Sequence, residues 1–173
     1  EAIGLVVRRI EILRAYSRLA QNKKNFSVLS CNEVVERTLR QLQPLIEEKK
    51  AHITVSPLPE VIGDGEQLGL LFKNLIQNAL SFCHGKTPEI HISVTEKEFM
   101  WEFAVADNGI GIDPVYREFV FSIFQCLDNE SPDRGEGVGL TFSRRVAENH
   151  GGTIRYESDG ENGTCFYFTL PKR

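Results

Sequence analysis

The fold of this chain is decided by the stretch Val105-Ala106-Asp107-Asn108-Gly109-Ile110-Gly111-Ile112-Asp113. The run before it, residues 100–105, alternates as a strand does, and Asp113 followed by Pro114 predicts a helix start. Between them a carboxylate and two glycines stand at spacing D-x-G-x-G, and glycine lets a backbone approach a ligand closely. Because the Asp107 carboxylate only accepts hydrogen bonds, a flat ligand with an exocyclic amine, such as adenine, would suit it. Asp-Asn-Gly is also an ordinary tight turn, so this stretch alone leaves both interpretations open.

The composition is that of an ordinary globular chain. The 173 residues are 41% hydrophobic and 25% charged with a net charge of −4, which predicts one domain, or one domain plus an appendage, and no nucleic-acid surface. The four cysteines are far apart, which indicates reduced, mostly buried thiols in a cytoplasmic protein. No membrane span or signal peptide is visible. The first residue is Glu, which predicts a fragment whose parent protein could still be membrane-attached.

Residues 1–21 are predicted to form a helix that is apolar on two sides. A seam recurs at alternating steps of three and four residues, as in a heptad repeat, and a second stripe runs beside it. The seam is Ile3, Val6, Ile10, Leu13, Ser17 and Ala20, and the stripe is Leu5, Ile12, Tyr16 and Leu19. A helix apolar on two sides has to be covered on two sides. We expect part of a helical bundle, against the alternative of a helix packed on its own domain, followed by a linker at 22–25.

The remaining chain alternates between strand and helix patterns. Strands are predicted at 26–29, 53–55, 61–62, 89–96, 99–105, 153–157 and 164–170, and helices at about 31–50, 65–83, 114–121 and 140–150. Asp64 is the expected cap of the helix at 65–83.

That helix carries the second informative pattern. Leu68, Leu71, Leu75, Ala79 and Phe82 share one face, and Gln67, Asn74, Asn78 and Ser81 share another about 90° away. Asparagine is a mediocre helix former, so two of them one turn apart suggest a polar role. An amide oxygen is a hard ligand that suits Mg²⁺. Two solvated asparagines remain the alternative on this helix alone.

A glycine-rich loop, Gly135-Glu136-Gly137-Val138-Gly139-Leu140, opens the third pattern. It leads into a helix that ends in His150-Gly151-Gly152. A loop of this kind presents free N–H groups and the positive end of a helix dipole to phosphate. It is not a Walker loop, because no Gly-Lys-Ser/Thr follows, and its spacing is not that of a dinucleotide fingerprint.

The order of these motifs resembles the catalytic ATP-binding domain of sensor histidine kinases. Asn-x-x-x-Asn-Ala, Asp-x-Gly-x-Gly, Ile-Phe-x-x-Leu, Gly-x-Gly-x-Gly-Leu before His-Gly-Gly, and Gly-Thr-x-Phe-x-Phe-x-Leu-Pro follow one another between residues 26 and 171. The segment Phe-Ser-Ile-Phe-Gln-x-Leu looks most like the corresponding segment of phytochrome-type kinases. The leading helix, with Ala15-Tyr16-Ser17-Arg18-Leu19, looks like the second helix of the family's dimerisation and phosphoacceptor hairpin. Residues 1–21 would then belong to that hairpin, and 26–173 to the catalytic domain.

The resemblance implies a Bergerat-type α+β two-layer sandwich, with a mixed, mostly antiparallel sheet covered by helices on one face. It implies that Asp107 receives the adenine amine of ATP and that Asn78 ligates Mg²⁺ with support from Asn74. The other implied ATP contacts are Phe82 beside the base, Gly109, Gly111 and Ile112 around the pocket, Gly137, Gly139 and Leu140 around the phosphates, and Thr164 on the base side. Residues 124–136 would form a lid.

Three departures from the family pattern bear on activity. No histidine in the chain is followed by Glu or Asp, so the phosphoacceptor lies upstream or on another protein. The asparagine helix has Ser81 where the family usually has lysine. Cys126 and the acidic run 128–130 stand where the family often has arginine or histidine, which leaves Arg134 as the nearest candidate phosphate cation. Phosphoryl transfer depends on neutralising phosphate charge, so we expect weak kinase activity, or a degenerate domain that binds nucleotide or a partner and signals by conformation.

The resemblance also implies partners: the phosphoacceptor histidine of its own or a partner subunit, a response regulator receiver domain, and a second copy joined through the leading helix. ATP-hydrolysing relatives such as gyrase, mismatch-repair and heat-shock chaperone ATPases carry a glutamate base four residues before the metal asparagine. That position is Asn74 here, and an amide cannot take the proton. Anti-sigma-type serine kinases share the fold, but the leading helix favours a histidine kinase.

Overall fold

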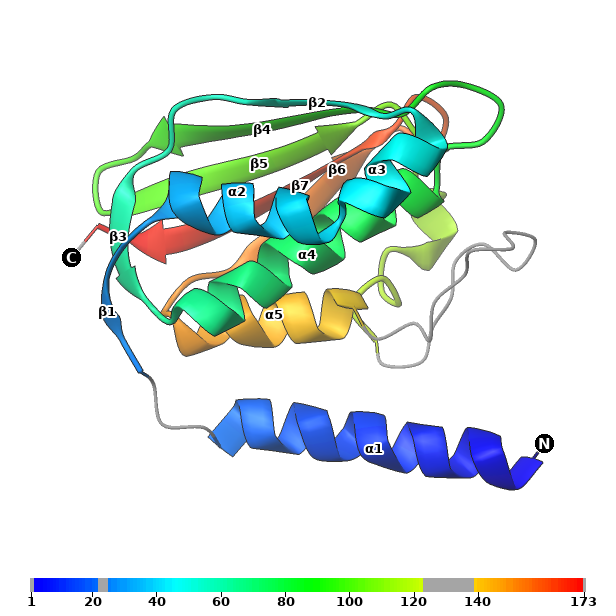
Figure 1. The fold of residues 1–173 in the computed structure, drawn as a ribbon, viewed down its shortest axis with the longest axis horizontal. Helices are drawn as coiled ribbons and strands as arrows, with labels where there is room; N and C mark the ends of the chain where they lie inside the picture. The colour runs from blue at the N-terminus through cyan, green and yellow to red at the C-terminus, as the bar shows by residue number, and fades with distance from the viewer. Residues whose placement is uncertain (1, 22–24, 123–138, 173) are drawn as a thin grey trace.

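A computed structural model describes residues 2–21, 25–122 and 139–172. The chain forms two layers, in which a five-stranded sheet is covered on one face by helices, with helix α1 beyond them (Figure 1). The helices are α1 (Ala2–Gln21), α2 (Cys31–Gln41), α3 (Gln43–Lys49), α4 (Gly65–Ser81) and α5 (Gly139–Asn149), with a 3₁₀ turn, η1, at Pro114–Tyr116. The strands are β1 (Ser27–Ser30), β2 (His52–Val55), β3 (Glu60–Gly63), β4 (Glu89–Glu96), β5 (Met100–Asp107), β6 (Ile154–Ser158) and β7 (Thr164–Pro171).

The large sheet is mixed and mostly antiparallel, as expected. Its strand order is β2-β4-β5-β7-β6, and only the edge pair β2–β4 is parallel. Strand β5 lies in the middle, so its last residue, Asp107, emerges between β4 and β7. Strands β1 and β3 were both predicted, and they form a separate antiparallel pair; this pairing was not predicted from the sequence.

Helix α4 supplies the centre of the core. Its predicted apolar face is buried except at Phe82, which is only partly buried; the buried residues of α4 are Gln67, Leu68, Leu71, Phe72, Leu75, Ile76, Ala79 and Leu80. Phe72 meets Phe103 and Phe168 edge-on, with ring centroids 6.0 and 5.3 Å away, and those two rings stack at 4.9 Å. This close packing holds α4 on the sheet, because interior side chains have little room to shift. Asp64 caps the helix as predicted, accepting from the N–H groups of its first turn.

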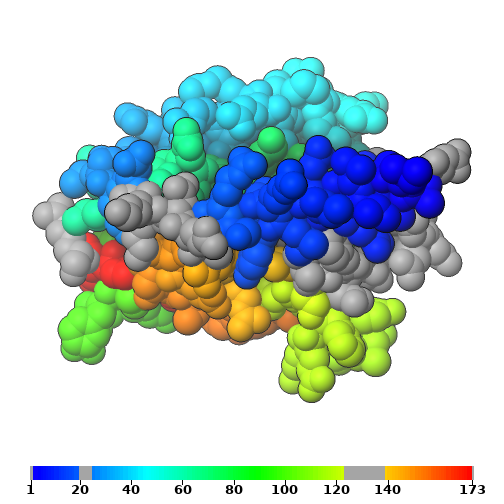
Figure 2. Space-filling view, turned by 90° about the horizontal axis from the view of Figure 1, so that it is seen from below, coloured from blue at the N-terminus to red at the C-terminus, as the bar shows by residue number. Residues whose placement is uncertain are grey.

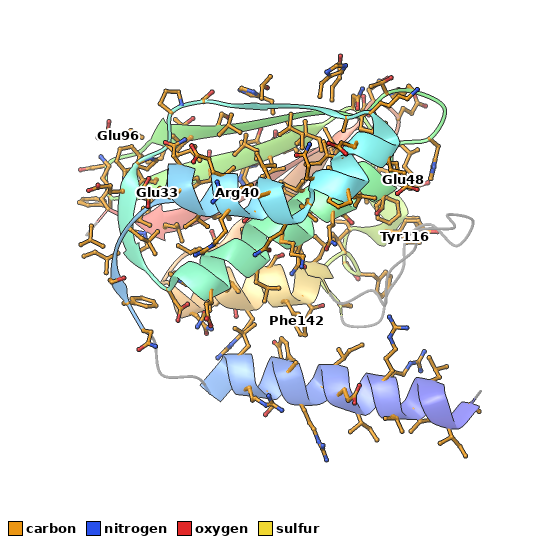
Figure 3. All side chains as sticks on the ribbon, in the orientation of Figure 1. Glu33, Arg40, Glu48, Glu96, Tyr116 and Phe142 are labelled. Carbon is orange, nitrogen blue, oxygen red and sulfur yellow. The ribbon has the colours of Figure 1, made fainter. Side chains whose placement is uncertain are left out.

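Helix α1 packs one of its two apolar stripes on α5. The ring of Tyr16 stacks on Phe142 at 5.8 Å, and Asn149 donates a hydrogen bond to the carbonyl of Leu19 at 3.0 Å. Figure 2 shows α1 (blue) beside α5 (orange), and Figure 3 places Phe142 between the two helices. From Ile3 to Ser17, the part of the predicted seam whose side chains are described, the seam stays at the surface, with Ile3 80% exposed. The predicted helix is therefore confirmed, and it contacts its own domain through Tyr16 and Leu19 at the C-terminal end of the second stripe, while Leu5 is exposed and the bundle role of the seam stays a prediction.

Two element predictions were wrong. The single helix predicted at 31–50 is divided at Leu42, because Pro44 has no N–H to continue the helical hydrogen bonds and stands instead in the first turn of α3, which begins at Gln43. The helix predicted at 114–121 is only the short turn η1, followed by further turns. Residues 113–119 are all exposed, so little packing could stabilise so short a helix.

Two further expectations concern membranes and thiols. Among the described helices, none is long and apolar enough to cross a membrane. Three of the four cysteines are free thiols, as predicted, and the fourth, Cys126, lies outside the described residues.

Candidate functional site

The Asp107 carboxylate is held by backbone groups at the end of β5. Its Oδ1 accepts hydrogen bonds from the N–H of Gly109 at 2.8 Å and the N–H of Thr164 at 3.2 Å. Among the described residues no partner is found for Oδ2, so one oxygen is fixed and the other can accept from a ligand. Burial raises the pKa of Asp107 above its ordinary value, and the two backbone hydrogen bonds and the charge of Lys86 oppose that rise.

Two glycines of the motif stand where a side chain would not fit. A Cβ on Gly109 would lie 2.5 Å from the carbonyl oxygen of Phe82. Gly111 has φ of +77°, and a Cβ there would lie 2.8 Å from the backbone of Gly160 and of Glu161. Both positions therefore require glycine on steric grounds, because each lies against the protein's own backbone; the predicted close approach to a ligand stays a prediction.

The C-terminal end of α4 closes one side of this loop. The carbonyl of Phe82 accepts a hydrogen bond from the N–H of Ile110 at 2.9 Å. Phe82 is partly buried and follows the last helical residue, Ser81, directly. The structure thus brings Phe82, Gly109 and Asp107 together, as a base pocket would require.

The two asparagines of α4 differ in their contacts. The Asn74 amide donates to the carbonyl of Gly139 at 3.1 Å, which ties α4 to the start of α5. Asn78, one turn further on, is partly buried, and its side chain has no hydrogen bond within the described part of the chain. Its amide oxygen is therefore available to a ligand. Asn74 and Phe82 are separated by about 12 Å along the helix axis, so α4 spans the distance from the Gly139 end of the site to the Asp107 loop.

The remaining predicted positions fall into two groups. Ile112 is a buried member of the hydrophobic core, Thr164 is buried beside Asp107, and Leu140 is partly buried against the core. Gly137, Arg134 and the expected lid at 124–136 lie outside the described residues.

Two residues of the site were missed by sequence reasoning. Asn108 accepts from the N–H of Glu89 at 2.9 Å and donates to the carbonyl of Thr87 at 3.0 Å, which joins the loop before β4 to the Asp107 loop. Ser158 accepts from the N–H of Ile112 at 2.8 Å. Asn108 sits inside the motif but was interpreted only as a turn residue, and the one available signal for Ser158 was its place before the glycine-containing turn 159–163.

Comparison with known proteins identifies the family. Residues 63–173 match the family described as histidine kinase-, DNA gyrase B- and HSP90-like ATPase. The chain belongs to this family. It is 38% identical to cyanobacterial phytochrome A of Nostoc sp. over 99% of this chain and 22% of that protein. It is 37% identical to the phytochrome-like protein Cph1 of Synechocystis sp. over 98% of this chain and 23% of that protein.

A solved structure agrees with this assignment. The mycobacterial sensor histidine kinase MprB superposes with a TM-score of 0.70 at 26% identity, over 86% of this chain and 98% of that chain. The expected fold is confirmed, and within the ATPase family this chain is a domain of the histidine kinase class that is similar in sequence to phytochromes. The chain spans less than a quarter of the length of the two phytochrome relatives.

Proposed function

We propose that this chain binds ATP with Mg²⁺ and transfers the γ-phosphoryl group to a histidine outside residues 1–173. The observation that carries the proposal is the Asp107 carboxylate, which has one oxygen fixed by two backbone N–H groups and the other open. An acceptor held in this way matches the exocyclic amine of adenine. Gly109, where any side chain would strike the Phe82 carbonyl, lets the loop that carries Asp107 pack closely against the end of α4.

The other end of the site fits the phosphates and the metal. Asn78 offers an amide oxygen with no partner among the described residues, and Mg²⁺ takes few protein ligands because it keeps several waters. Asn78 would hold the ion and Asn74 would support it from the previous turn. When bound, Mg²⁺ would neutralise charge on the phosphate oxygens. Gly137, Gly139 and Leu140 would wrap the phosphates, with Arg134 as the added cation.

The acceptor histidine, the second copy and the response regulator receiver domain are all proposed to lie outside residues 1–173. None of the four histidines precedes an acidic residue, and His150 is buried and accepts a hydrogen bond from the N–H of Asp64 at 3.1 Å. We therefore place the acceptor on the helical hairpin to which α1 would contribute. That hairpin would join two copies, and a response regulator receiver domain would take the phosphoryl group next.

The test has two stages. Calorimetry on residues 1–173 should show Mg²⁺-dependent binding of ATP and weaker binding of GTP, since guanine presents a carbonyl where adenine presents its amine. Labelled ATP should then pass its γ-phosphoryl group to an added acceptor hairpin. Absence of ATP binding would remove the proposal, and binding without any transfer would replace it with the second candidate.

That second candidate is a nucleotide-binding module that signals by conformation. One observation favours it: Ser81, the last residue of α4, stands where the histidine kinase pattern has a lysine. ATP hydrolysis as the main activity has no such support. The Asn74 amide, which stands at the position of the hydrolytic glutamate, donates to Gly139 and cannot act as a base.

A further inference from the structure

Ser158 uses every hydrogen-bonding capacity of its hydroxyl. Its Oγ accepts from the N–H of Ile112 at 2.8 Å and from the N–H of Gly160 at 3.2 Å, and donates to the carbonyl of Gly163 at 2.9 Å. A serine hydroxyl has one proton and two lone pairs, so the group is fully satisfied. The bond to Ile112 joins residues 46 positions apart, and it connects the end of β6 to the Asp107 loop.

The turn that Ser158 holds, residues 159–163, lies directly on the Asp107 loop. A Cβ on Gly163 would lie 2.1 Å from the carbonyl oxygen of Asp107, and a Cβ on Gly111 would lie 2.8 Å from Gly160. Immediately after the turn, the N–H of Thr164 donates to Asp107 Oδ1. The position of the turn therefore decides where one of the two donors to the carboxylate stands.

The shape of the turn does not depend on Ser158 alone. Asp159 Oδ1 accepts from the N–H groups of Glu161 and Asn162, each at 2.8 Å, and Oδ2 accepts from the Asn162 amide. These hydrogen bonds lower the pKa of Asp159 to about 2, so its charge persists at any assay pH above that value. Removing the Ser158 hydroxyl should therefore loosen the attachment of the turn to the Asp107 loop more than it changes the turn itself.

We propose that Ser158 is a positioning residue of the base pocket. By fastening the 159–163 turn to Ile112, it keeps the Thr164 N–H on Asp107 and so orients the free carboxylate oxygen toward the base. The inference rests on the proposed ATP binding and concerns the base end of that site only.

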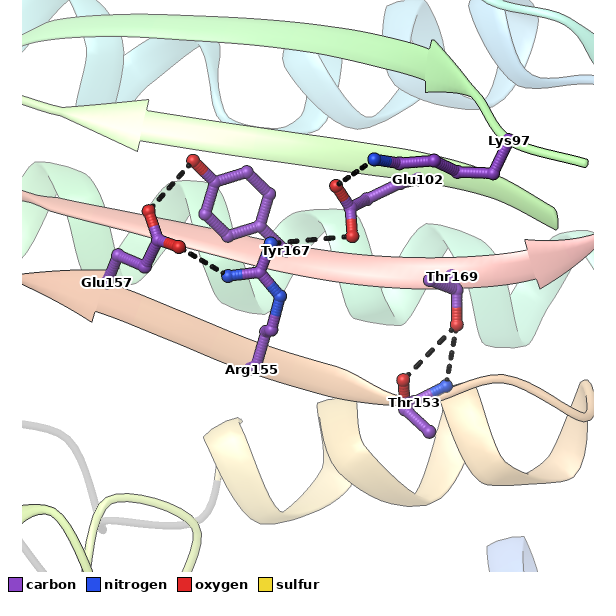
Figure 4. A network of polar contacts seen from close by, with 7 residues as sticks. All are labelled: Lys97, Glu102, Thr153, Arg155, Glu157, Tyr167 and Thr169. Carbon is purple, nitrogen blue, oxygen red and sulfur yellow. Dashed lines mark hydrogen bonds and ion pairs between the residues drawn. The ribbon is translucent and has the colours of Figure 1, made fainter.

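A matched control lies next to Ser158 on the same strand. Because side chains alternate along a strand, Glu157 points to the opposite face of the sheet. There it accepts from Arg155 at 2.7 Å and from the Tyr167 hydroxyl at 3.4 Å, and Arg155 also reaches Glu102 (Figure 4). Glu157→Gln changes a polar contact of β6 and leaves the Asp107 loop untouched.

Ser158→Ala in residues 1–173 should raise the Kd for Mg–ATP about five- to tenfold, the effect expected for one or two lost hydrogen bonds. Its pH profile should also move. Because the Thr164 hydrogen bond lowers the pKa of Asp107, loosening it should shift the pH at which ATP affinity declines upward. Glu157→Gln should change neither the Kd nor the profile.

The outcomes separate this inference from the proposed function. A wild-type chain that fails to bind ATP removes the function itself. If the wild type binds, unchanged affinity in a folded Ser158→Ala chain overturns the positioning role. Weaker affinity with an unshifted pH profile also overturns it, because a loss of fold stability alone would give that result. Should Ser158→Ala not fold, Ser158→Cys keeps the side chain's size with a weaker acceptor, and the same upward shift in Kd and pH is required of it.

Discussion

The two ends of the candidate site are held differently. At the base end, protein groups bond one another: backbone N–H groups fix Asp107, Asn108 fixes the loop before β4, and Ser158 fixes the following turn. At the phosphate end, Asn74 makes one bond, to Gly139, and Asn78 makes none with described residues. The base end is preorganised before any ligand arrives, which favours affinity, since binding then pays little to order the protein groups. We infer that the phosphate end is completed by the nucleotide and its metal.

The largest effect should follow from changing the acceptor at the preorganised end. Asp107→Asn replaces the carboxylate, which only accepts hydrogen bonds, by an amide whose NH₂ group can only donate. A hydrogen bond to a charged group contributes about 1.5–3 kcal/mol. We expect ATP affinity to fall about 10- to 100-fold by calorimetry, with the fold retained. Glu102→Gln makes the same chemical change on the opposite face of β5 and is the control. If the Asp107→Asn chain bound ATP as tightly as the wild type, the Asp107 carboxylate would not be part of the ATP site.

At the phosphate end, the variant should affect ATP binding through Mg²⁺. Asn78→Ala removes the one amide oxygen assigned to Mg²⁺, so we expect a loss of about tenfold in ATP affinity with Mg²⁺ present and almost none in its absence. The neighbouring Gln77→Ala is the control on the same helix. If calorimetry shows that ATP binding to the Asn78→Ala chain still strengthens with Mg²⁺ as in the wild type, the metal lies elsewhere.

The difference between the ends also explains what the sequence could predict. The faces of α4 and the D-x-G-x-G loop were visible because helical period and glycine spacing are local properties. The attachments made by Ser158 and Asn108 were not, because their partners are 46 and about 20 residues away and depend on which strands become neighbours. Pro44 is a helix breaker visible in the sequence, but the continuous apolar pattern of 31–50 was given more weight in predicting a single helix. In the helix expected at 114–121 the first residues, 114–119, are exposed, so tertiary packing does not extend the turn into a helix there, and no local pattern reveals that.

Acidity offers a milder way to disturb the base end. Since burial raises the pKa of Asp107 above the ordinary 3.8, its carboxylate should take up a proton at a higher pH than an exposed aspartate does. ATP affinity measured on lowering the pH should therefore decline by a few-fold before ordinary aspartates titrate, while Asp107→Asn should give a flat profile there. A wild-type profile equally flat down to pH 4 would contradict the buried, ionised acceptor.

Protein stability should show the opposite sign in the same window. Between the ordinary pKa and the raised pKa, the folded state binds more protons at Asp107 than the unfolded state does. The free energy of unfolding should therefore fall as pH rises through that window. Urea titrations of the wild type against Asp107→Asn measure the difference, and a wild type that gains stability relative to the variant on raising the pH would contradict the sign.

The smallest effect should come from adding positive charge at the phosphate end. Ser81→Lys together with Cys126→Arg, a position outside the described residues, supplies the two cations that the histidine kinase pattern has and this chain lacks. Phosphoryl transfer depends on charge neutralisation, so transfer to an added acceptor hairpin should become about twofold faster. Ser81 is the last residue of α4, where a cation also favours the helix dipole, so the melting temperature should not fall. Faster transfer with ATP affinity changed little would show that the base end was already sufficient and that the phosphate end limits the rate. An unchanged rate in a folded, ATP-binding variant would mean that these two positions do not limit transfer.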